Sequence, residues 1–246
     1  MFSYEGDLLM SDEIWDKVWT KKLIISDYSI KYLEFINKIK KDLPDGSKII
    51  EAGCGTGQTL ALFSNDQDTF GLDISPAALK LARENCKYTV QGSIFSMPFD
   101  NDVFDLVYNS GVIEHFRDPE NIAAIKEMAR VVKPSGKVII IVPNTLCLWY
   151  KAGKTVAVIL KNFEFGYEED YSVYRLEHAM EQADLIIETR FGLQAFPPLA
   201  TNNREILSMS RRKIISRFEH LLPAKQYYAY TVGIIARKKA HPINHN

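Results

Sequence analysis

The chain has 246 residues, of which 46% are hydrophobic, and its 30 basic residues face 31 acidic ones for a formal net charge of −1. This length suits one α/β domain with additions, and the apolar fraction allows a sizeable core. The charge balance creates no overall field toward nucleic acid or an anionic membrane, so we expect neither as a partner. Three cysteines without metal-ligand spacing indicate a reducing, cytoplasmic compartment.

The N-terminal region predicts two helices and no signal peptide, because residues 1–12 carry acids and lack an apolar core. Apolar residues recur at helical spacing over residues 11–20 and 27–41. Trp15, Trp19 and Tyr28 belong to this region. Their rings either pack as ordinary core or close over a bound cation.

Downstream, apolar runs alternate with amphipathic segments that are bounded by turn residues. The alternation implies right-handed crossovers and a parallel sheet covered on both faces, so the fold class is α/β. Strands are expected at residues 48–52, in a run ending at Asp73, and at residues 87–91, 103–108, 137–142, 184–191 and 226–236. Helices are expected from Gln58 onward and at residues 76–85, 118–131, 172–182 and 204–222, with a turn at 134–136 and an aromatic-rich insertion at 144–170.

A glycine-rich stretch organises the chain, because the first strand leads into glycines at every second position, Gly53, Gly55 and Gly57. Glycine tolerates positive φ and lets a ligand approach the backbone, and a loop between a strand and a helix offers N–H groups to an anion. The dinucleotide motif Gly-x-Gly-x-x-Gly would place its third glycine at Gln58. An NAD-dependent dehydrogenase is therefore disfavoured.

Polar residues follow the next strands in the same way. Asp73 stands twenty residues after Gly53, where an acid at a strand tip can accept hydrogen bonds from ribose hydroxyls or else cap the following helix. Ser93 and Asn109 follow the third and fourth strands. Because ligands of parallel sheets bind beyond the carboxyl ends of the strands, these residues predict one shared site.

Four segments resemble class I S-adenosylmethionine-dependent methyltransferases of the small-molecule, methyltransferase type 11-like kind. They are residues 51–57 (Glu-Ala-Gly-Cys-Gly-Thr-Gly), 71–75, 97–107 and 112–116 (Val-Ile-Glu-His-Phe). The likeness is strong over residues 47–144 and weak over 171–238. It implies S-adenosylmethionine as cofactor. It also implies a Rossmann-like, seven-stranded, mostly parallel sheet with helices on both faces, an antiparallel last strand and an N-terminal helical cap.

By this resemblance the glycine loop frames the methionine part of the cofactor, and Glu51 lies near its amino group. Asp73 takes the ribose hydroxyls, Ile74 packs on adenine, and the backbone after the fourth strand lines the sulfonium end. The whole expected cofactor-binding set is Glu51, Gly53, Cys54, Gly55, Thr56, Gly57, Asp73, Ile74, Ser93, Ile94, Asn109, Ser110, Gly111 and His115.

Some of these residues have a second interpretation. Ser93 stands where the family most often has an acid, so its hydroxyl or the backbone of Ile94 recognises adenine, or Ser93 only caps a turn. His115 is either a catalytic base for an acceptor hydroxyl or a positioning residue, and we favour positioning. Cys54 is interpreted as a small residue tolerated in the turn, and Glu114 as structural.

Aromatic segments where the family builds its substrate wall predict a small, partly apolar acceptor that is methylated at oxygen, nitrogen or carbon. We expect a monomer or homodimer without nucleic-acid partner, membrane or metal. The alternative is an S-adenosylmethionine-binding regulatory or partner protein without transfer activity. The chain is expected to be one domain, residues 1–246, with a helical cap at 1–45, a cofactor core at 46–143, an acceptor-side insertion at 144–170, the C-terminal part of the sheet at 171–238 and a tail at 239–246.

Overall fold

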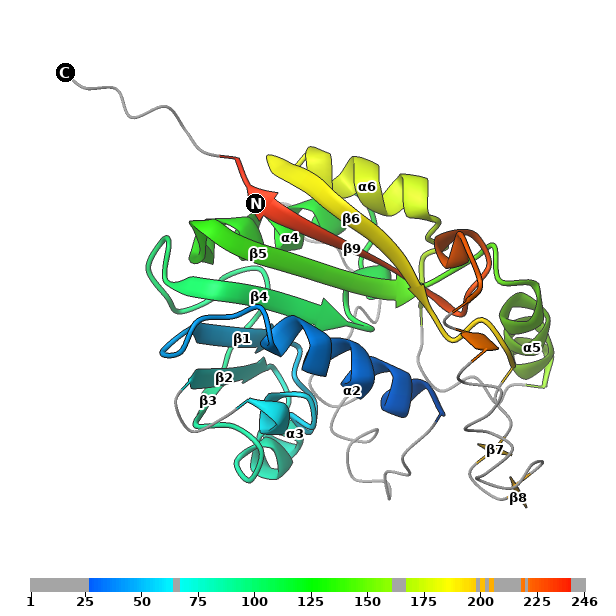
Figure 1. Cartoon of the computed structure of the whole chain (residues 1–246), viewed down its shortest axis with the longest axis horizontal. Coiled ribbons are helices and arrows are strands. Elements are labelled where there is room, and N and C mark those ends of the chain that lie inside the picture. The colour runs from blue at the N-terminus through cyan, green and yellow to red at the C-terminus, as the bar shows by residue number, and fades with distance from the viewer. Residues whose placement is uncertain are drawn as a thin grey trace, which may run out of the picture.

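Seven strands form one mixed sheet in the order β3-β2-β1-β4-β5-β9-β6 (Figure 1). β9 pairs antiparallel with β5 and β6, and the other neighbouring strands are parallel. The expected seven-stranded, mostly parallel sheet with an antiparallel last strand is confirmed. The strands are β1 (Lys48–Ala52), β2 (Asp68–Asp73), β3 (Tyr88–Gln91), β4 (Phe104–Ser110), β5 (Val132–Pro143), β6 (Leu185–Leu193) and β9 (Thr231–Lys238).

The computed structural model describes residues 27–63, 67–160, 167–197, 200–201, 204–205, 218–219 and 221–239. The helix expected at 11–20, with Trp15 and Trp19, lies outside the described residues, as do the Tyr28 side chain and most of the helix expected at 204–222. The expected start of that last helix is wrong, because Arg204–Glu205 forms β8 against β7 (Ala200–Thr201).

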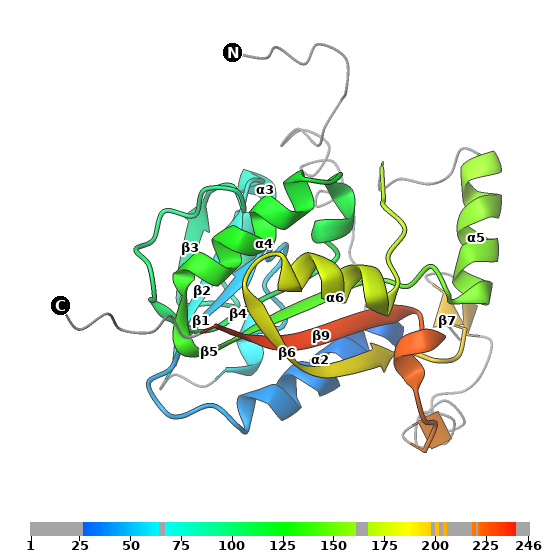
Figure 2. The same ribbon diagram turned by 90° about the horizontal axis from the view of Figure 1, so that it is seen from above.

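Helices cover both faces of the sheet (Figure 2). α4 (Glu120–Val131) and α6 (Val173–Glu181) lie side by side on one face, and α2 (Asp27–Lys40) crosses the other. Ile36 and Ile39 of α2 stand one helical turn apart, so both are buried in the core beneath this helix. The helix expected at 27–41 is therefore confirmed as α2.

The helix that follows β2 shows how sequence signals determine where a helix begins. α3 (Pro76–Ala82) has Pro at its first position, where a missing N–H costs nothing. The Ser75 side chain accepts a hydrogen bond from the Ala78 N–H at 3.1 Å, which caps the helix. This start fixes the chain just after the tip of β2, where Asp73 lies.

Two elements differ from expectation. The helix expected from Gln58 is, within the described residues, only the 3₁₀ turn η1 (Leu60–Leu62), so no long helix directs its dipole at the glycine loop. The turn expected at residues 134–136 is a bulge inside β5, which begins at Val132 because strand pairing to β4 continues across it.

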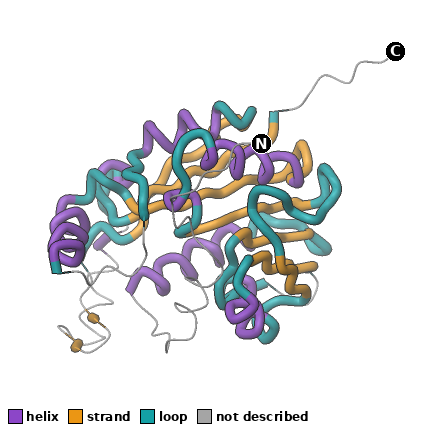
Figure 3. The backbone as a smooth tube through the Cα atoms, turned by 180° about the vertical axis from the view of Figure 1, so that it is seen from behind, coloured by secondary structure: helices purple, strands orange, loops and turns teal. Residues whose placement is uncertain are grey.

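The aromatic-rich insertion carries a helix, α5 (Leu148–Ile159), that stands away from the sheet (Figures 1 and 3). No residue of α5 is buried, and Leu148 is 81% exposed. Tyr150 contacts Tyr230 edge-on, with ring centroids 4.8 Å apart, which attaches the helix to the sheet. None of the described helices has the length and apolar content that crossing a membrane requires.

Candidate functional site

The loop after β1 is held against two neighbouring segments. The N–H groups of Gly53 and Cys54 both donate to the carbonyl oxygen of Leu72, at 2.7 and 2.9 Å. Gly53 has φ of 76°, and a Cβ there would lie 2.5 Å from Cγ2 of Val112. Only glycine fits this position, because both the backbone conformation and the space exclude a side chain.

Two other residues of the same loop, Cys54 and Thr56, make local packing and backbone contacts. The Cys54 thiol is buried, and a Cβ on Gly71 would lie 2.8 Å from its sulfur. Burial raises the pKa of this thiol, so it is not a reactive thiolate. Thr56 is partly exposed, and its carbonyl oxygen accepts from Asn85 Nδ2 at 2.8 Å.

Asp73 ties the tip of β2 to the glycine loop. Its Oδ2 accepts from the Gly55 N–H and its Oδ1 from the Ser75 N–H, each at 2.9 Å. The side chain is only 7% exposed. The carboxylate therefore fixes the loop, and a ribose would share these oxygens with the two N–H groups. Next to it, the Ile74 carbonyl oxygen accepts from Gln91 Nε2 at 3.3 Å.

Glu51 is a buried and strongly perturbed acid at this edge. Its carboxylate accepts from Thr59 Oγ1 at 2.6 Å, Tyr32 Oη at 3.0 Å and Tyr108 Oη at 3.4 Å. Burial raises the pKa of Glu51 to about 7, although these hydroxyls act in the opposite direction. A cationic ligand group beside Glu51 would favour its ionised form.

Sequence reasoning missed these three hydroxyl donors. Thr59 belongs to the stretch that was expected to be helical, and Tyr32 and Tyr108 come from α2 and β4. No sequence signal distinguishes them from core aromatic residues, because their convergence on Glu51 depends on how α2 crosses the sheet.

The segment after β3 gives Ser93 a local role. Its Oγ accepts from the Phe95 N–H at 3.2 Å, and its backbone bridges to Ser96. This contact supports the turn-capping interpretation. Ile94 is 6% exposed and packs in the core.

The segment after β4 approaches the glycine loop. Gly111 has φ of 75°, and its N–H donates to the carbonyl oxygen of Ile141 at 3.1 Å. Asn109 is fully buried, and its Nδ2 lies 3.3 Å from the sulfur of Met128. The Asn109 Oδ1 has no partner among the described residues, and Ser110 beside it is partly exposed.

Glu114 and His115 lie beneath the end of the insertion. His115 is 2% exposed, and its Nδ1–H donates to the Tyr167 carbonyl oxygen at 2.7 Å. Burial lowers the pKa of His115. The Glu169 N–H donates to the Glu114 carbonyl oxygen at 2.6 Å, and burial raises the pKa of the Glu114 carboxyl to about 8. Both side chains therefore favour their neutral forms near pH 7, and the insertion is held by the His115 ring and by the Glu114 backbone carbonyl.

The insertion contributes polar groups to the same region. Glu168 accepts from Tyr150 Oη at 3.0 Å and forms an ion pair with Lys154 at 2.8 Å. These contacts link α5 to the segment that covers His115. Within the described parts of the chain, no group of three His, Cys, Asp or Glu side chains could hold a metal ion.

The residues gathered at this edge fit S-adenosylmethionine, since an acid, a glycine-rich loop and a second acid follow one another along β1 and β2. Residues 50–140 match the family described as "Methyltransferase domain". Magnesium protoporphyrin IX methyltransferase of Synechocystis PCC 6803, solved with bound SAH, has TM-score 0.59 at 13% identity, over 92% of this chain and 93% of that one. Residues 50–140 therefore match a methyltransferase domain, and the sheet has the fold of class I S-adenosylmethionine-dependent methyltransferases.

Curated relatives share the core of this methyltransferase domain. "Probable tRNA methyltransferase 9B" of Mus musculus is 34% identical over 119 residues, 48% of this chain and 26% of the relative. The tRNA (carboxymethyluridine(34)-5-O)-methyltransferase of Arabidopsis thaliana is 34% identical over 104 residues, which are 42% of this chain and 25% of the relative. Demethylmenaquinone methyltransferase of Staphylococcus carnosus is 33% identical over 129 residues, which are 49% of this chain and 47% of the relative. The chain thus spans about a quarter of the first two relatives and about half of the third.

The expectation of a small-molecule acceptor without nucleic-acid partner, for a chain that is a monomer or homodimer, is wrong as it stands. Two of these relatives are named as tRNA methyltransferases. A chain from the complex of the Haloferax volcanii Trm112 methyltransferase activator with a methyltransferase has TM-score 0.58 at 16% identity, over 89% of this chain and 99% of that one. The error came from net charge, which averages over the whole surface and says nothing of local cationic patches.

Proposed function

We propose that this chain transfers a methyl group from S-adenosylmethionine to an oxygen, nitrogen or carbon atom of an acceptor, as one domain whose residues 46–143 bind the cofactor. The observation that carries the proposal is the convergence of Glu51, the glycine loop and Asp73 at the carboxyl ends of β1 and β2. The remaining residues of the expected cofactor set end or follow β1, β2, β3 and β4 in the chain, which supports the proposal.

Each of these groups has a task in binding. When bound, S-adenosylmethionine supplies a methyl group activated by a sulfonium. Glu51 offers a carboxylate to the ammonium of the methionine part, and the hydroxyls of Tyr32 and Thr59 orient it. Asp73 accepts from the ribose hydroxyls while it holds the loop. Because methyl transfer is an in-line displacement, much of the rate comes from holding donor and acceptor in line and excluding water.

We propose a positioning role for His115. Its Nδ1–H is engaged by the Tyr167 carbonyl oxygen, and the ring is 2% exposed. This arrangement supports an imidazole that fastens the insertion over the sulfonium end. A catalytic base would instead need to reach an acceptor hydroxyl within hydrogen-bonding distance.

The acceptor is the finer part of the proposal. Aromatic residues of the insertion, such as Trp149 and Tyr150, favour an acceptor with a flat or apolar part. The names of two relatives point to tRNA, and that of the third to a quinone precursor. Both classes share a flat ring, so we propose a ring-bearing acceptor and let the assay decide which molecule carries it.

The test measures formation of S-adenosylhomocysteine with unfractionated tRNA and, separately, with a metabolite extract. Product with either acceptor supports transfer and names the acceptor class. Tight binding of S-adenosylmethionine in calorimetry without product from either pool would support the alternative, a cofactor-binding regulatory or partner protein. Absence of cofactor binding would refute the proposal altogether.

A further inference from the structure

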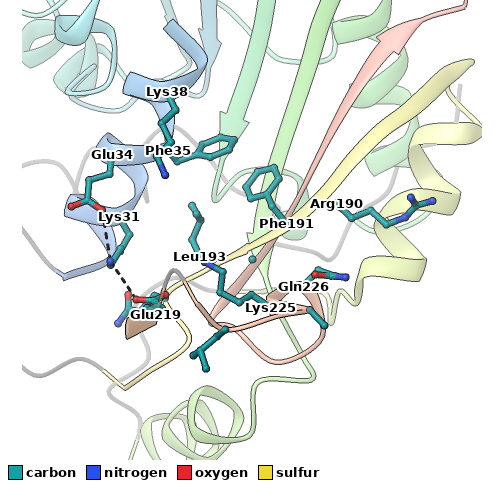
Figure 4. A pocket seen from close by; sticks show the side chains of 14 residues that line it. Lys31, Glu34, Phe35, Lys38, Arg190, Phe191, Leu193, Glu219, Lys225 and Gln226 are labelled. Carbon is teal, nitrogen blue, oxygen red and sulfur yellow. Dashed lines mark ion pairs between the residues drawn. The ribbon is translucent and has the colours of Figure 1, made fainter. Parts of the chain in front are cut away.

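A pocket of about 300 Å³ lies on the α2 face of the sheet at the carboxyl end of β6 (Figure 4). Its walls come from α2, from β6 and from the turn η3 (Lys225–Tyr227). Phe35 and Phe191 form one side, with their rings stacked at 4.2 Å. Four strand positions separate β6 from β1, about 19 Å at about 4.8 Å each, whereas the α2 wall of the pocket lies beside Tyr32, which donates to Glu51. None of the residues that line the pocket belongs to the expected cofactor-binding set, so we treat it as a site of its own.

Lysine side chains from two elements converge on this pocket. Lys31 and Lys38 come from α2, two helical turns apart, and Lys225 comes from η3. Lys31 lies 3.3 Å from Glu219 and 3.7 Å from Glu34, so these two carboxylates share it (Figure 4). Among the residues that the structure describes, neither Lys38 nor Lys225 forms an ion pair. The group of five side chains has a net charge of +1.

The crowding of these lysines affects the pKa of Lys225. Burial lowers the pKa of Lys225, Glu219 acts in the opposite direction, and the neighbouring Lys31 and Lys38 lower the pKa further. Like charges held together in a partly buried place disfavour one another. An anion in the pocket would remove this repulsion, whereas a neutral ligand would leave it.

Gln194 sets a second and independent requirement on the chemistry of the ligand that the pocket binds. It lines the pocket, is 5% exposed, and its Oε1 has no hydrogen-bond partner among the described residues. Its backbone has φ of 60°, which is unfavourable for a residue other than glycine. A buried acceptor without a donor is destabilising, so a ligand that fits here also carries an N–H or O–H group.

We propose that this pocket binds a ribose phosphate. Its phosphate contacts Lys38 and Lys225, a sugar hydroxyl donates to Gln194, and the apolar part of the nucleotide lies against the phenylalanine wall. The phosphate belongs either to a free nucleotide or to an RNA chain. The pocket goes beyond the proposed methyl transfer, and only its RNA arm rests on that function, because a strand anchored at β6 could reach along the edge to the cofactor site.

The first experiment is calorimetric titration of the full chain with uridine 5′-monophosphate and with a single-stranded RNA oligonucleotide. We expect Lys38→Ala and Lys225→Ala each to weaken binding by about tenfold, the effect of one lost charged hydrogen bond. Lys41→Ala is the matched control, because Lys41 follows α2, is exposed and does not line the pocket. Equal affinity in all four proteins would overturn the proposal.

The second experiment tests the hydroxyl. Wild type should bind uridine 5′-monophosphate more tightly than its 2′,3′-dideoxy analogue, and Gln194→Leu should bind the two equally. Circular dichroism and S-adenosylmethionine affinity report whether each variant is folded. A wild type that does not distinguish the two nucleotides would overturn the role of Gln194.

The outcomes separate this proposal from the methyl-transfer proposal. Loss of nucleotide binding in the lysine variants, with unchanged S-adenosylmethionine affinity, supports the pocket even if no RNA is methylated. Binding of the mononucleotide but not of RNA assigns the pocket to a free nucleotide. A wild type that binds S-adenosylmethionine and neither phosphate probe refutes the pocket alone.

Discussion

The carboxyl edge of the sheet has two halves that are built differently. In the half formed by β1, β2 and β4, carboxylates are buried and bonded to backbone or hydroxyl groups, as Asp73 is to Gly55 and Ser75. In the half formed by β5, β9 and β6, α5 buries none of its residues and a pocket lined by lysines stays open. The first half, where we propose the cofactor site, is held by buried hydrogen bonds, whereas the second half keeps an exposed helix and an open pocket.

The largest expected effect is at Gly53. Gly53→Ala should lose about 2–5 kcal/mol of unfolding free energy, because the left-handed backbone costs about 1–2 kcal/mol and the clash with Val112 about 1–3 kcal/mol. Gly46→Ala is the control, since Gly46 has φ of 77° and nothing within 4 Å of a Cβ. Urea unfolding measures both, and equal losses would mean that close approach to Val112 is unimportant.

A pH series tests the buried acid. Folding raises the pKa of Glu51 from 4.5 to about 7, so its stabilising contribution is complete below pH 4.5 and is lost as pH rises to about 7. That difference corresponds to about 3 kcal/mol. The stability of Glu51→Gln, plotted against wild type, should therefore improve across this range, whereas parallel curves would contradict the raised pKa.

Asp73→Ala should weaken S-adenosylmethionine binding by about 1–3 kcal/mol, the range for losing a buried charged hydrogen bond. Asp73→Asn keeps one acceptor oxygen and should fall between this variant and wild type. Calorimetry measures the three affinities, and undiminished affinity in Asp73→Ala would remove this residue from the site.

His115→Ala should lower turnover by about tenfold or less, because the imidazole fastens the insertion through one hydrogen bond. His115→Asn is the matched variant, since its amide can replace the Nδ1–H contact to Tyr167, and it should restore turnover. A general base would give a loss of about 10²–10⁴ in both variants, with cofactor affinity unchanged.

The smallest effect belongs to the insertion. Leu148→Ser should change stability by less than about 0.5 kcal/mol, because Leu148 is 81% exposed. Thermal unfolding checks this value, and Leu72→Ser, at a side chain 1% exposed, is the contrasting core substitution. A large loss at Leu148 would show that α5 packs against a partner in the protein sample, for example a second copy.

Local patterns explain why the fold was predictable. The pattern of apolar residues and the turn residues predicted the bounds of β1 and α2 to within one residue. A buried strand and an amphipathic helix each have a characteristic pattern of apolar residues in the sequence. The helix expected after the glycine loop failed, since Thr59 and Leu60 have side chains that suit a 3₁₀ turn as well as a helix. Such ambiguity in a short segment is resolved by the packing around it.

The candidate site divides in the same way. Glycine spacing and an acid at the tip of β2 predicted Gly53 and Asp73, because parallel strands bring their carboxyl ends to one edge whatever covers them, and the family resemblance added Glu51. The tyrosine hydroxyls around Glu51 and the carbonyl above His115 were not predictable, since these partners are 19 to 57 residues away in the chain, and only Thr59 is nearer, eight residues from Glu51. Net charge misled us about partners for a related reason, as it carries no position.

The sequence by itself determined the alternation of strands and helices, the spacing of the glycines after β1, and the match of residues 50–140 to a methyltransferase family. Only the tertiary structure decided the ionisation of Glu51, the burial of His115 and the meeting of Lys38 with Lys225 at β6. The physical reason is range. Backbone conformation is set by a residue and its neighbours in sequence, whereas solvation and charge depend on groups that folding alone brings together.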